Sequence, residues 1–271
     1  MATAQRLSAA GFHPDFGAPS NLNTGNALLW FDQMITQVPQ SLQYLTELSY
    51  HRYGGDTPEN LQAIGDRTVQ HGIDSAMTEK IAAKYLQLHQ DLKLGRVSSW
   101  QQFTLAYPTD DNGAQYYRVD RSDPANPTVH IGRRSKFLRQ YFRFIRSGAQ
   151  RIGADSNQGE LDPVAFINTD GTYVVVVQAT AAASLSIEGL PSGTYGIKYT
   201  TSGQYDVDLP DVTIGTGQPV QAEIPAVGVI TIYGVSEASA DPGSLAFASS
   251  SYEVAEDGGT ATIGVVRTGG S

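Results

Sequence analysis

Hydrophobic and polar positions follow two different patterns along the chain, and the change falls near residue 148. Up to that point, short apolar runs alternate with segments whose apolar residues recur every three or four positions. This alternation predicts strand–helix units on a parallel sheet. The clearest unit has a buried strand over residues 45–51 and a helix that begins at Thr57-Pro58-Glu59 and stops at Gly72. Proline in a first turn and glycine after a last turn are typical helix ends.

The unit before it is less sharply marked. Its strand is weak and falls at residues 9–12 or 17–19. Its helix is capped by Asn23 or Thr24 and ended by Pro39.

The third unit places a carboxylate at the end of a strand. Its strand covers residues 73–78, and Glu79 stands where the chain passes into a helix over residues 81–92. Gly95 follows that helix and is predicted to cap it.

The fourth unit has a strand over residues 97–105 and a helix up to Gly148. The polar stretch between them, residues 107–126, is long enough to predict a functional loop. Apolar side chains such as Phe137 and Tyr141 recur on one side of the helix, and basic residues crowd the other: Arg133, Arg134, Lys136, Arg139, Arg143, Arg146 and Arg151. We expect the solvated face of a packed helix here and no nucleic-acid partner.

Beyond residue 148 the apolar runs have strand character and are separated by turn residues. Two of them, residues 164–168 and 173–178, flank the turn Thr169-Asp170-Gly171 and predict a hairpin. Further runs predict strands at residues 183–187, 193–200, 212–214, 220–224 and 228–234. This spacing is typical of an antiparallel sandwich.

The predicted fold class is therefore α/β plus all-β. Four βα units over residues 1–148 precede a β-sandwich over 149–234, a linker over 235–243 and two β-runs over 244–271. Charge supports the main boundary, because residues 1–151 hold 16 Lys and Arg against 13 Asp and Glu, whereas residues 152–271 hold 2 against 14. Two strands alone are not stable in water, so the last segment is predicted to be the front of a truncated module or a tail on the sandwich.

Composition excludes several functional classes. The chain contains no cysteine, which excludes disulfides, thiolate zinc sites and cysteine nucleophiles. Its apolar runs are far shorter than the roughly 18 residues of a membrane helix, and its N-terminus lacks a signal-peptide pattern. The histidines have no metal-ligand spacing and no phosphate-binding loop is present, so we expect neither a metal site in the first two regions nor nucleotide chemistry.

Candidate chemistry lies where the parallel strands end, because their carboxyl ends converge on one face. Glu79 is placed there as a nucleophile or general acid/base, with the alternative that it only favours a helix N-terminus. His51 and Tyr53 can hydrogen-bond a sugar or orient a carboxylate. Trp100 and Gln102 offer a flat apolar face and an amide, a pairing suited to carbohydrate. A purely structural role is the open alternative for each of these four residues.

Three stretches of this half have a recognisable order and spacing: ELSYHRYGG at residues 47–55, SAMTE at 75–79 and SSWQQF at 98–103. They resemble the last strands of retaining glycoside hydrolase (β/α)8 barrels, in the clan with one catalytic glutamate after strand four and another after strand seven. Residues 146–171 resemble the entry to the C-terminal β-sandwich of glycoside hydrolase family 30. The resemblance spans residues 5–234.

The resemblance implies that Glu79 is the nucleophile, Trp100 the aromatic residue of the last strand, and His51 and Tyr53 site residues of the strand before the nucleophile. It also implies that the first four strands, with the acid/base glutamate, are not in this chain, which then holds half a barrel. Other acids, Asp110, Asp111, Asp120 or Glu160, replace it only if their loops fold across the site. Open sheet edges predict self-association, and we expect a homodimer of two half-barrels.

Residues 243–261 are similar to the opening of Calx-beta modules, which often bind calcium through acidic loops, with Glu253, Glu256 and Asp257 as the relevant acids. Together the resemblances imply a secreted or cell-surface bacterial hydrolase of β-linked oligo- or polysaccharides, with its export signal upstream and no cofactor other than this calcium. The alternative function is a non-catalytic carbohydrate-binding or scaffold fragment of a larger glycosidase.

Overall fold

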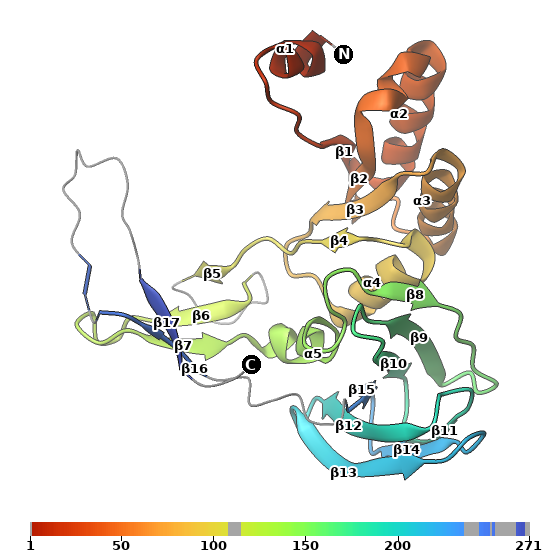
Figure 1. Ribbon diagram of the computed structural model, residues 1–271, viewed down its shortest axis with the longest axis vertical. Coiled ribbons are helices and arrows are strands. Elements are labelled where there is room, and N and C mark those ends of the chain that lie inside the picture. Colours follow the sequence, from red (N-terminus) through yellow and green to blue (C-terminus); the bar gives the residue numbers. More distant parts are fainter. Residues whose placement is uncertain (1, 108–114, 236–243, 250, 253–263, 269–271) are drawn as a thin grey trace.

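The computed structural model describes residues 2–107, 115–235, 244–249, 251–252 and 264–268. Its two largest sheets are a parallel sheet of four strands and an antiparallel sheet of six. Figure 1 shows them at different ends of the molecule, with helix α5 between them.

The parallel sheet has its strands in sequence order: β1 (Phe16–Asn23), β2 (Leu45–Gly54), β3 (Asp74–Glu79) and β4 (Ser99–Trp100). β1 lies at the second of the two positions that the sequence left open. The first position, residues 9–12, is not a strand, because helix α1 (Ala2–Ala9) and a turn after it occupy it.

Two helices cover one face of this sheet, α2 (Thr24–Gln37) and α3 (Pro58–His71), with the short 3-10 helix η1 (Pro39–Tyr44) after α2. Oδ1 of Asn23 accepts the N–H groups of Gly25 and Asn26, and the Thr57 hydroxyl accepts that of Asn60, so the side-chain caps lie where the sequence predicts them. The core between helices and strands consists of Ala27, Leu28, Phe31, Leu48, Tyr50, Leu61, Ile64, Met77 and Val97.

The predicted helix over residues 81–92 is wrong in its bounds. Ile81 instead bridges to Phe103, and Ala82 has a φ of 58°, so helix α4 (Tyr85–Gln90) begins later. It continues as the π-helical turn η2 (Asp91–Gly95). The left-handed residue after that turn is Arg96, not Gly95. Gly95 is required by close approach, since a Cβ there would lie 2.8 Å from the Tyr50 hydroxyl.

Of the strand predicted over residues 97–105, only β4 forms a regular ladder with β3. Beyond it, the Gln101 N–H donates to the Met77 carbonyl and Phe103 makes an isolated parallel bridge to Ile81. The predicted loop over residues 107–126 overlaps a small sheet, which consists of β5 (Ala106–Tyr107), β6 (Tyr117–Asp120) and β7 (Thr128–Ile131) and extends beyond the loop. Residues 108–114, with Asp110 and Asp111, lie outside the described residues.

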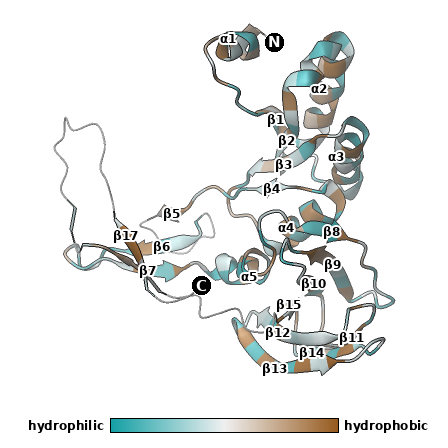
Figure 2. Ribbon diagram, in the orientation of Figure 1, coloured by the Kyte–Doolittle hydropathy of each residue, from teal (hydrophilic) through white to brown (hydrophobic). Residues whose placement is uncertain are grey.

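The predicted antiparallel region is confirmed. Its six-stranded sheet has the order β13-β12-β15-β10-β9-β8, and β11 pairs with β14 in a two-stranded layer. Along β14 buried and exposed residues alternate, and Figure 2 shows alternating hydropathy along β13 and β14. The strands are β8 (Gln150–Ile152), β9 (Leu161–Ile167), β10 (Tyr173–Ala179), β11 (Ala183–Ile187), β12 (Gly193–Thr201), β13 (Val207–Ile214), β14 (Val220–Ile224) and β15 (Gly228–Gly234).

Helix α5 (Arg133–Phe142) ends six residues before Gly148 and packs on β12 and β15. The Gln140 side chain is fully buried, donates to the Thr200 hydroxyl at 2.9 Å and accepts from the Thr231 hydroxyl at 2.9 Å. The basic face is not simply solvated. Arg139 and Arg143 pair with Asp206, and the Lys136 ammonium lies 4.2 Å from the centre of the Tyr205 ring.

Two more strands follow, β16 (Ser244–Phe247) and β17 (Val265–Thr268), which pair antiparallel. Most of the predicted linker, residues 236–243, lies outside the described residues, as do Glu253, Glu256 and Asp257.

Candidate functional site at the ends of the parallel strands

A β-bulge places Glu79 on the face of the sheet that α2 and α3 leave uncovered. Tyr50 pairs with Met77, and both contribute to the core under the helices. The next pair is His51 with Glu79, so Thr78 is an extra residue on β3. Because side chains alternate along a strand, an unbulged β3 would turn Glu79 toward the helices. With the bulge, Glu79 lies beside His51.

Tyr53 joins Glu79 on this face through its hydroxyl. The Tyr53 hydroxyl donates to Oε1 of Glu79 at 3.0 Å and accepts the Ile81 backbone N–H at 2.8 Å. Burial raises the pKa of Tyr53, the Ile81 N–H opposes the rise, and the hydrogen bond and charge of Glu79 add to it. Tyr53 therefore remains a donor that fixes one oxygen of Glu79.

His51 and Lys80 complete the immediate surroundings of Tyr53. The rings of His51 and Tyr53 meet edge to face with centroids 6.1 Å apart. The Lys80 ammonium lies 4.8 Å from the centre of the Tyr53 ring, a cation–π contact. Nδ1 of His51 is buried and has no hydrogen-bond partner among the described residues. The structure thus brings together three of the residues identified in the sequence, His51, Tyr53 and Glu79.

The position of Trp100 is fixed by a hydrogen bond to its indole N–H and by packing of its ring. Its indole N–H donates to Oδ2 of Asp91 at 2.8 Å. The half-buried ring lies 6.0 Å from that of Phe142 and packs against both the sheet core and the core around α5. In the described part of the chain, the Trp100 indole N–H is bonded to Asp91 and not to Glu79.

Gln102 is buried, with 6% of its surface exposed. Its backbone N–H donates to the Tyr116 hydroxyl at 3.2 Å, while both side-chain amide atoms lack a partner within the described ranges. An unpaired buried amide is costly, so this group is suited to hold a polar molecule only if one reaches it. Within the described residues, no hydrogen bond joins the Gln102 side chain to Glu79, His51 or Tyr53.

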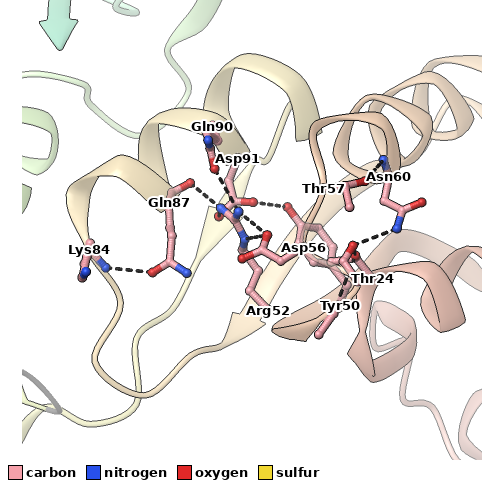
Figure 3. A network of polar contacts seen from close by, with 12 residues as sticks. Thr24, Tyr50, Arg52, Asp56, Thr57, Asn60, Lys84, Gln87, Gln90 and Asp91 are labelled. Atoms are coloured by element: carbon pink, nitrogen blue, oxygen red, sulfur yellow. Dashed lines mark hydrogen bonds and ion pairs between the residues drawn. The ribbon is translucent and has the colours of Figure 1, made fainter. Parts of the chain in front are cut away.

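A buried ion pair behind the site was not identified from the sequence. Arg52 lies between His51 and Tyr53 on β2, points to the opposite face, and pairs with Asp91 at 3.2 Å (Figure 3). Burial raises the pKa of Asp91 to about 6, although the Arg52 charge and hydrogen bonds from Tyr50, Trp100 and Arg52 oppose the rise. A charged residue directly after the predicted buried strand over residues 45–51 was the available signal, since buried charges are normally paired.

Within the described residues, no group of three or more His, Asp or Glu side chains is arranged to hold a metal ion. None of the described helices is long and apolar enough to cross a membrane. What the arrangement offers chemically is one carboxylate, oriented by a phenol and flanked by an imidazole, on an open face. Such a group serves as a nucleophile or a general acid/base.

A family model, the glycosyl hydrolase family 30 beta sandwich domain, matches residues 148–232. Among solved structures, the chain is similar to the catalytic domain of GH30 xylanase C from Talaromyces cellulolyticus, with a TM-score of 0.69, 18% identity and coverage of 86% of this chain and 55% of that one. The chain is also similar to a GH30 endoxylanase from Clostridium papyrosolvens C71, with a TM-score of 0.66, 18% identity and coverage of 83% of this chain and 57% of that one. For the endo-beta1,6-glucanase BT3312, the TM-score is 0.60 and the identity 19%, with coverage of 86% of this chain and 51% of that one.

No curated protein sequence matches the chain. At these identities the structural similarity shows a shared fold, and the chain spans 51–57% of the length of the three structures. The family model thus supports the expected relation to family 30 over residues 148–232. For the larger part of the chain, the solved structures show a shared fold.

Proposed function

We propose that this chain is the C-terminal part of a family 30-like glycoside hydrolase and that Glu79 is its catalytic nucleophile for β-linked sugars. One observation carries the proposal: Glu79 ends a strand of a parallel sheet and receives the Tyr53 hydroxyl at 3.0 Å on the open face. A carboxylate that attacks a sugar must be ionised and correctly aimed. A hydrogen bond to one oxygen leaves the other available for the reaction.

The neighbouring residues have proposed roles that follow from their contacts. His51 and Tyr53 line the sugar site beside Glu79, and Tyr53 also orients the carboxylate. Trp100 offers the exposed part of its half-buried ring to a sugar, while its N–H is bonded to Asp91. Gln102, with an unpaired amide, is the proposed hydrogen-bonding partner of a substrate hydroxyl.

The second carboxylate of a glycosidase is proposed to come from outside residues 2–107. Retaining glycosidases place their two carboxyl groups about 5 Å apart, whereas inverting ones leave room for a water. Of the acids considered from the sequence, Asp120 is engaged with Ser122 and Arg118 on β6. Glu160 precedes β9 in the sandwich. Among the described residues, neither acid shares a hydrogen bond with Glu79, whose carboxylate is bonded to Tyr53.

The proposed source of that carboxylate is a second half-barrel that completes the first. Four parallel strands with helices on one face leave two edges, at β1 and β4, and an uncovered face. Self-association of two copies covers these surfaces and is the simplest arrangement with eight strands. The two Glu79 copies then lie four strands apart. If that separation leaves room for a water, Glu79 acts in this assembly as the general base of an inverting reaction, and not as the nucleophile of a retaining one. Sedimentation that shows only monomer at micromolar concentration would contradict this assembly.

The hydrolase proposal is tested with wild type and Glu79→Gln on aryl β-glycosides, xylan and β-1,6-glucan. The substitution removes the charge and keeps the shape. We expect hydrolysis by wild type and a loss of about a hundredfold or more in Glu79→Gln, on the order expected for a key carboxylate. Glu47→Gln is the matched control, because Glu47 lies on the same sheet at the other end of β2.

Equal loss in Glu79→Gln and Glu47→Gln would contradict a special role for Glu79. If wild type hydrolyses none of the substrates yet binds them, the second candidate function is supported: a non-catalytic carbohydrate-binding or scaffold fragment. A specific observation favours that candidate, since the described site has one carboxylate where glycosidases use two.

For residues 244–271 we propose the beginning of a Calx-beta-like module. The antiparallel pairing of β16 and β17 supports it. We also propose calcium binding there and, by analogy with similar multidomain glycosidases, a secreted or cell-surface location. A calcium titration followed by thermal unfolding tests the first point, with no shift in melting temperature as the opposing result.

A further inference from the structure

The guanidinium of Arg52 is the centre of a buried polar network directly behind the candidate site (Figure 3). Only 2% of Arg52 is exposed, yet its N–H groups are all directed at acceptors from other elements. Nε donates to Asp56 at 2.6 Å, Nη1 to the Gln87 carbonyl at 2.9 Å and Nη2 to the Gln90 side chain at 3.0 Å. The end of β2 is thereby connected to the loop before α3 and to α4.

Asp91 extends this network to two further positions of the sheet. It is fully buried and accepts the Tyr50 hydroxyl on Oδ1 at 2.8 Å and the Trp100 indole N–H on Oδ2 at 2.8 Å. Oδ2 also faces Nη1 of Arg52 at 3.2 Å. Tyr50 belongs to β2 and Trp100 to β4, so one carboxylate links the second strand to the fourth across β3, the strand that carries Glu79.

Because side chains alternate along β2, the residues held by the buried network and the residues beside Glu79 lie on opposite faces of the same strand. Tyr50 and Arg52 point toward the helices, whereas His51 and Tyr53 point toward Glu79. Any twist or slip of β2 that moved Tyr53 from Glu79 would also pull Arg52 from its buried partners. A buried charge without its partner is strongly unfavourable, so the ion pair opposes such a movement.

We propose that Arg52 and Asp91 are positioning residues that hold the Tyr53 hydroxyl on Glu79 and the Trp100 ring at the edge of the same site. Neither touches the proposed substrate. The proposal deepens the glycosidase function and rests on it for its effect on turnover, but its geometric content does not depend on turnover.

Amide exchange of Ile81 provides a readout of this geometry. The Ile81 N–H is bonded to the Tyr53 hydroxyl, and the Ile81 side chain is exposed, so its protection depends on Tyr53 staying in place. The Gln101 N–H, bonded to the Met77 carbonyl at 2.8 Å in the same sheet, reports the stability of the sheet itself. If Arg52 is a positioning residue, its replacement should accelerate exchange of the Ile81 amide more than exchange of the Gln101 amide.

The experiment measures both amides by NMR in the full chain for Arg52→Met, Arg52→Lys and Asp56→Asn. We expect exchange at Ile81 to accelerate at least tenfold relative to Gln101 in Arg52→Met, and less in Arg52→Lys, which keeps the charge. Asp56→Asn weakens the contacts of the carboxylate with Nε and Nη2 of Arg52. Because Arg52 keeps Asp91 as a partner, no buried charge is left unpaired, and this variant remains informative if Arg52→Met does not fold. Its expected acceleration is about threefold.

Arg67→Met is the matched control. Arg67 makes a two-pronged ion pair with Asp32 between α2 and α3, at 2.8 and 2.6 Å, on the outer side of the helices. It is expected to leave the ratio of Ile81 to Gln101 exchange unchanged. If the Arg52 and Asp56 variants change both amides equally, or neither, Arg52 has no positioning role and the proposal is overturned.

Where hydrolysis is measurable, the same Arg52 and Asp56 variants are expected to lower kcat with KM changed less than threefold, because they disturb the carboxylate more than the sugar contacts. A rise in KM with kcat unchanged would contradict the proposal. Selective exchange at Ile81 in a chain that hydrolyses nothing would refute the proposed function while leaving the positioning geometry supported.

Discussion

Tyr53 and Glu79, 26 positions apart in the sequence, are joined by a hydrogen bond of 3.0 Å between the phenol hydroxyl and a carboxylate oxygen. The bond exists because β2 and β3 are adjacent parallel strands and because a bulge at Thr78 turns Glu79 to the face that Tyr53 occupies. The same hydroxyl accepts the Ile81 N–H, which fixes the start of the segment after β3.

The first prediction concerns this bond. Tyr53→Phe removes the hydroxyl and keeps the ring against His51 and Lys80. We expect a loss of about tenfold to a hundredfold in kcat/KM, since Glu79 loses the group that orients it. Steady-state kinetics on an aryl β-glycoside measures the effect. Tyr117→Phe, on the exposed surface of β6, is the control and is expected to behave as wild type.

A second prediction concerns the core under α2. Phe31 has no exposed surface and packs among the apolar residues between α2, α3 and the sheet. Phe31→Ala is expected to lower the free energy of unfolding by about 3–5 kcal/mol, through lost burial and the remaining cavity. Urea denaturation measures the change. Phe12→Ala, at a position that is 65% exposed, should change it by less than about 0.5 kcal/mol.

The third prediction is a pH dependence that arises between the two sheets. Asp162 on β9 pairs with Lys93, and its Oδ2 lies 3.5 Å from Nε2 of His89. Burial acts to raise the pKa of Asp162, but the hydrogen bonds and charges of His89 and Lys93 outweigh it and lower the pKa to about 2.

A carboxyl with a lower pKa in the folded state stabilises the fold above its unfolded value of 3.8. That stabilisation is lost as pH falls through the folded value of about 2. The free energy of unfolding of wild type should therefore fall more steeply between about pH 4 and pH 2 than that of Asp162→Asn. Parallel profiles for the two proteins would show that Asp162 is not linked to folding.

A fourth prediction concerns Gln140, whose side-chain amide links α5 to β12 and β15. Gln140→Leu keeps the volume and leaves the Thr200 hydroxyl without this partner. Because that hydroxyl is buried, the expected loss is about 1–3 kcal/mol. Denaturant unfolding measures it, with Gln62→Leu on α3, where the side chain is only partly buried, as the control. A loss as small as that of the control would mean that water replaces the missing bond.

The sequence predicted those parts of the fold that depend on local signals. Asn23 and Thr57 are found as helix caps, and the Thr169-Asp170-Gly171 turn joins β9 to β10. Each of these features depends on a few neighbouring residues, whose side-chain or backbone preferences do not change with the rest of the fold.

The features that the sequence did not predict depend on contacts between distant residues. The bulge at Thr78 follows from pairing with β2 and has no local signature. The π-helical turn at Asp91 accompanies the burial of that carboxylate against Arg52, 39 positions earlier. The sequence predicts Glu79, His51 and Tyr53 as neighbours because parallel strands end together. The hydrogen bond from Trp100 to Asp91 could not be predicted, because it depends on how the folded chain places these two residues.

Helix α5 belongs to both parts of the molecule. Its side chains Leu138 and Tyr141 share one core with Leu88 of α4 and with Val174 and Val229 of the sandwich. A cut at residue 148 would strip this helix from the sandwich and uncover Val174, Val176 and Val229 on the face of its large sheet. The change in charge and strand pattern near residue 148 therefore does not separate two units that fold independently. The two parts should unfold together in a single calorimetric transition.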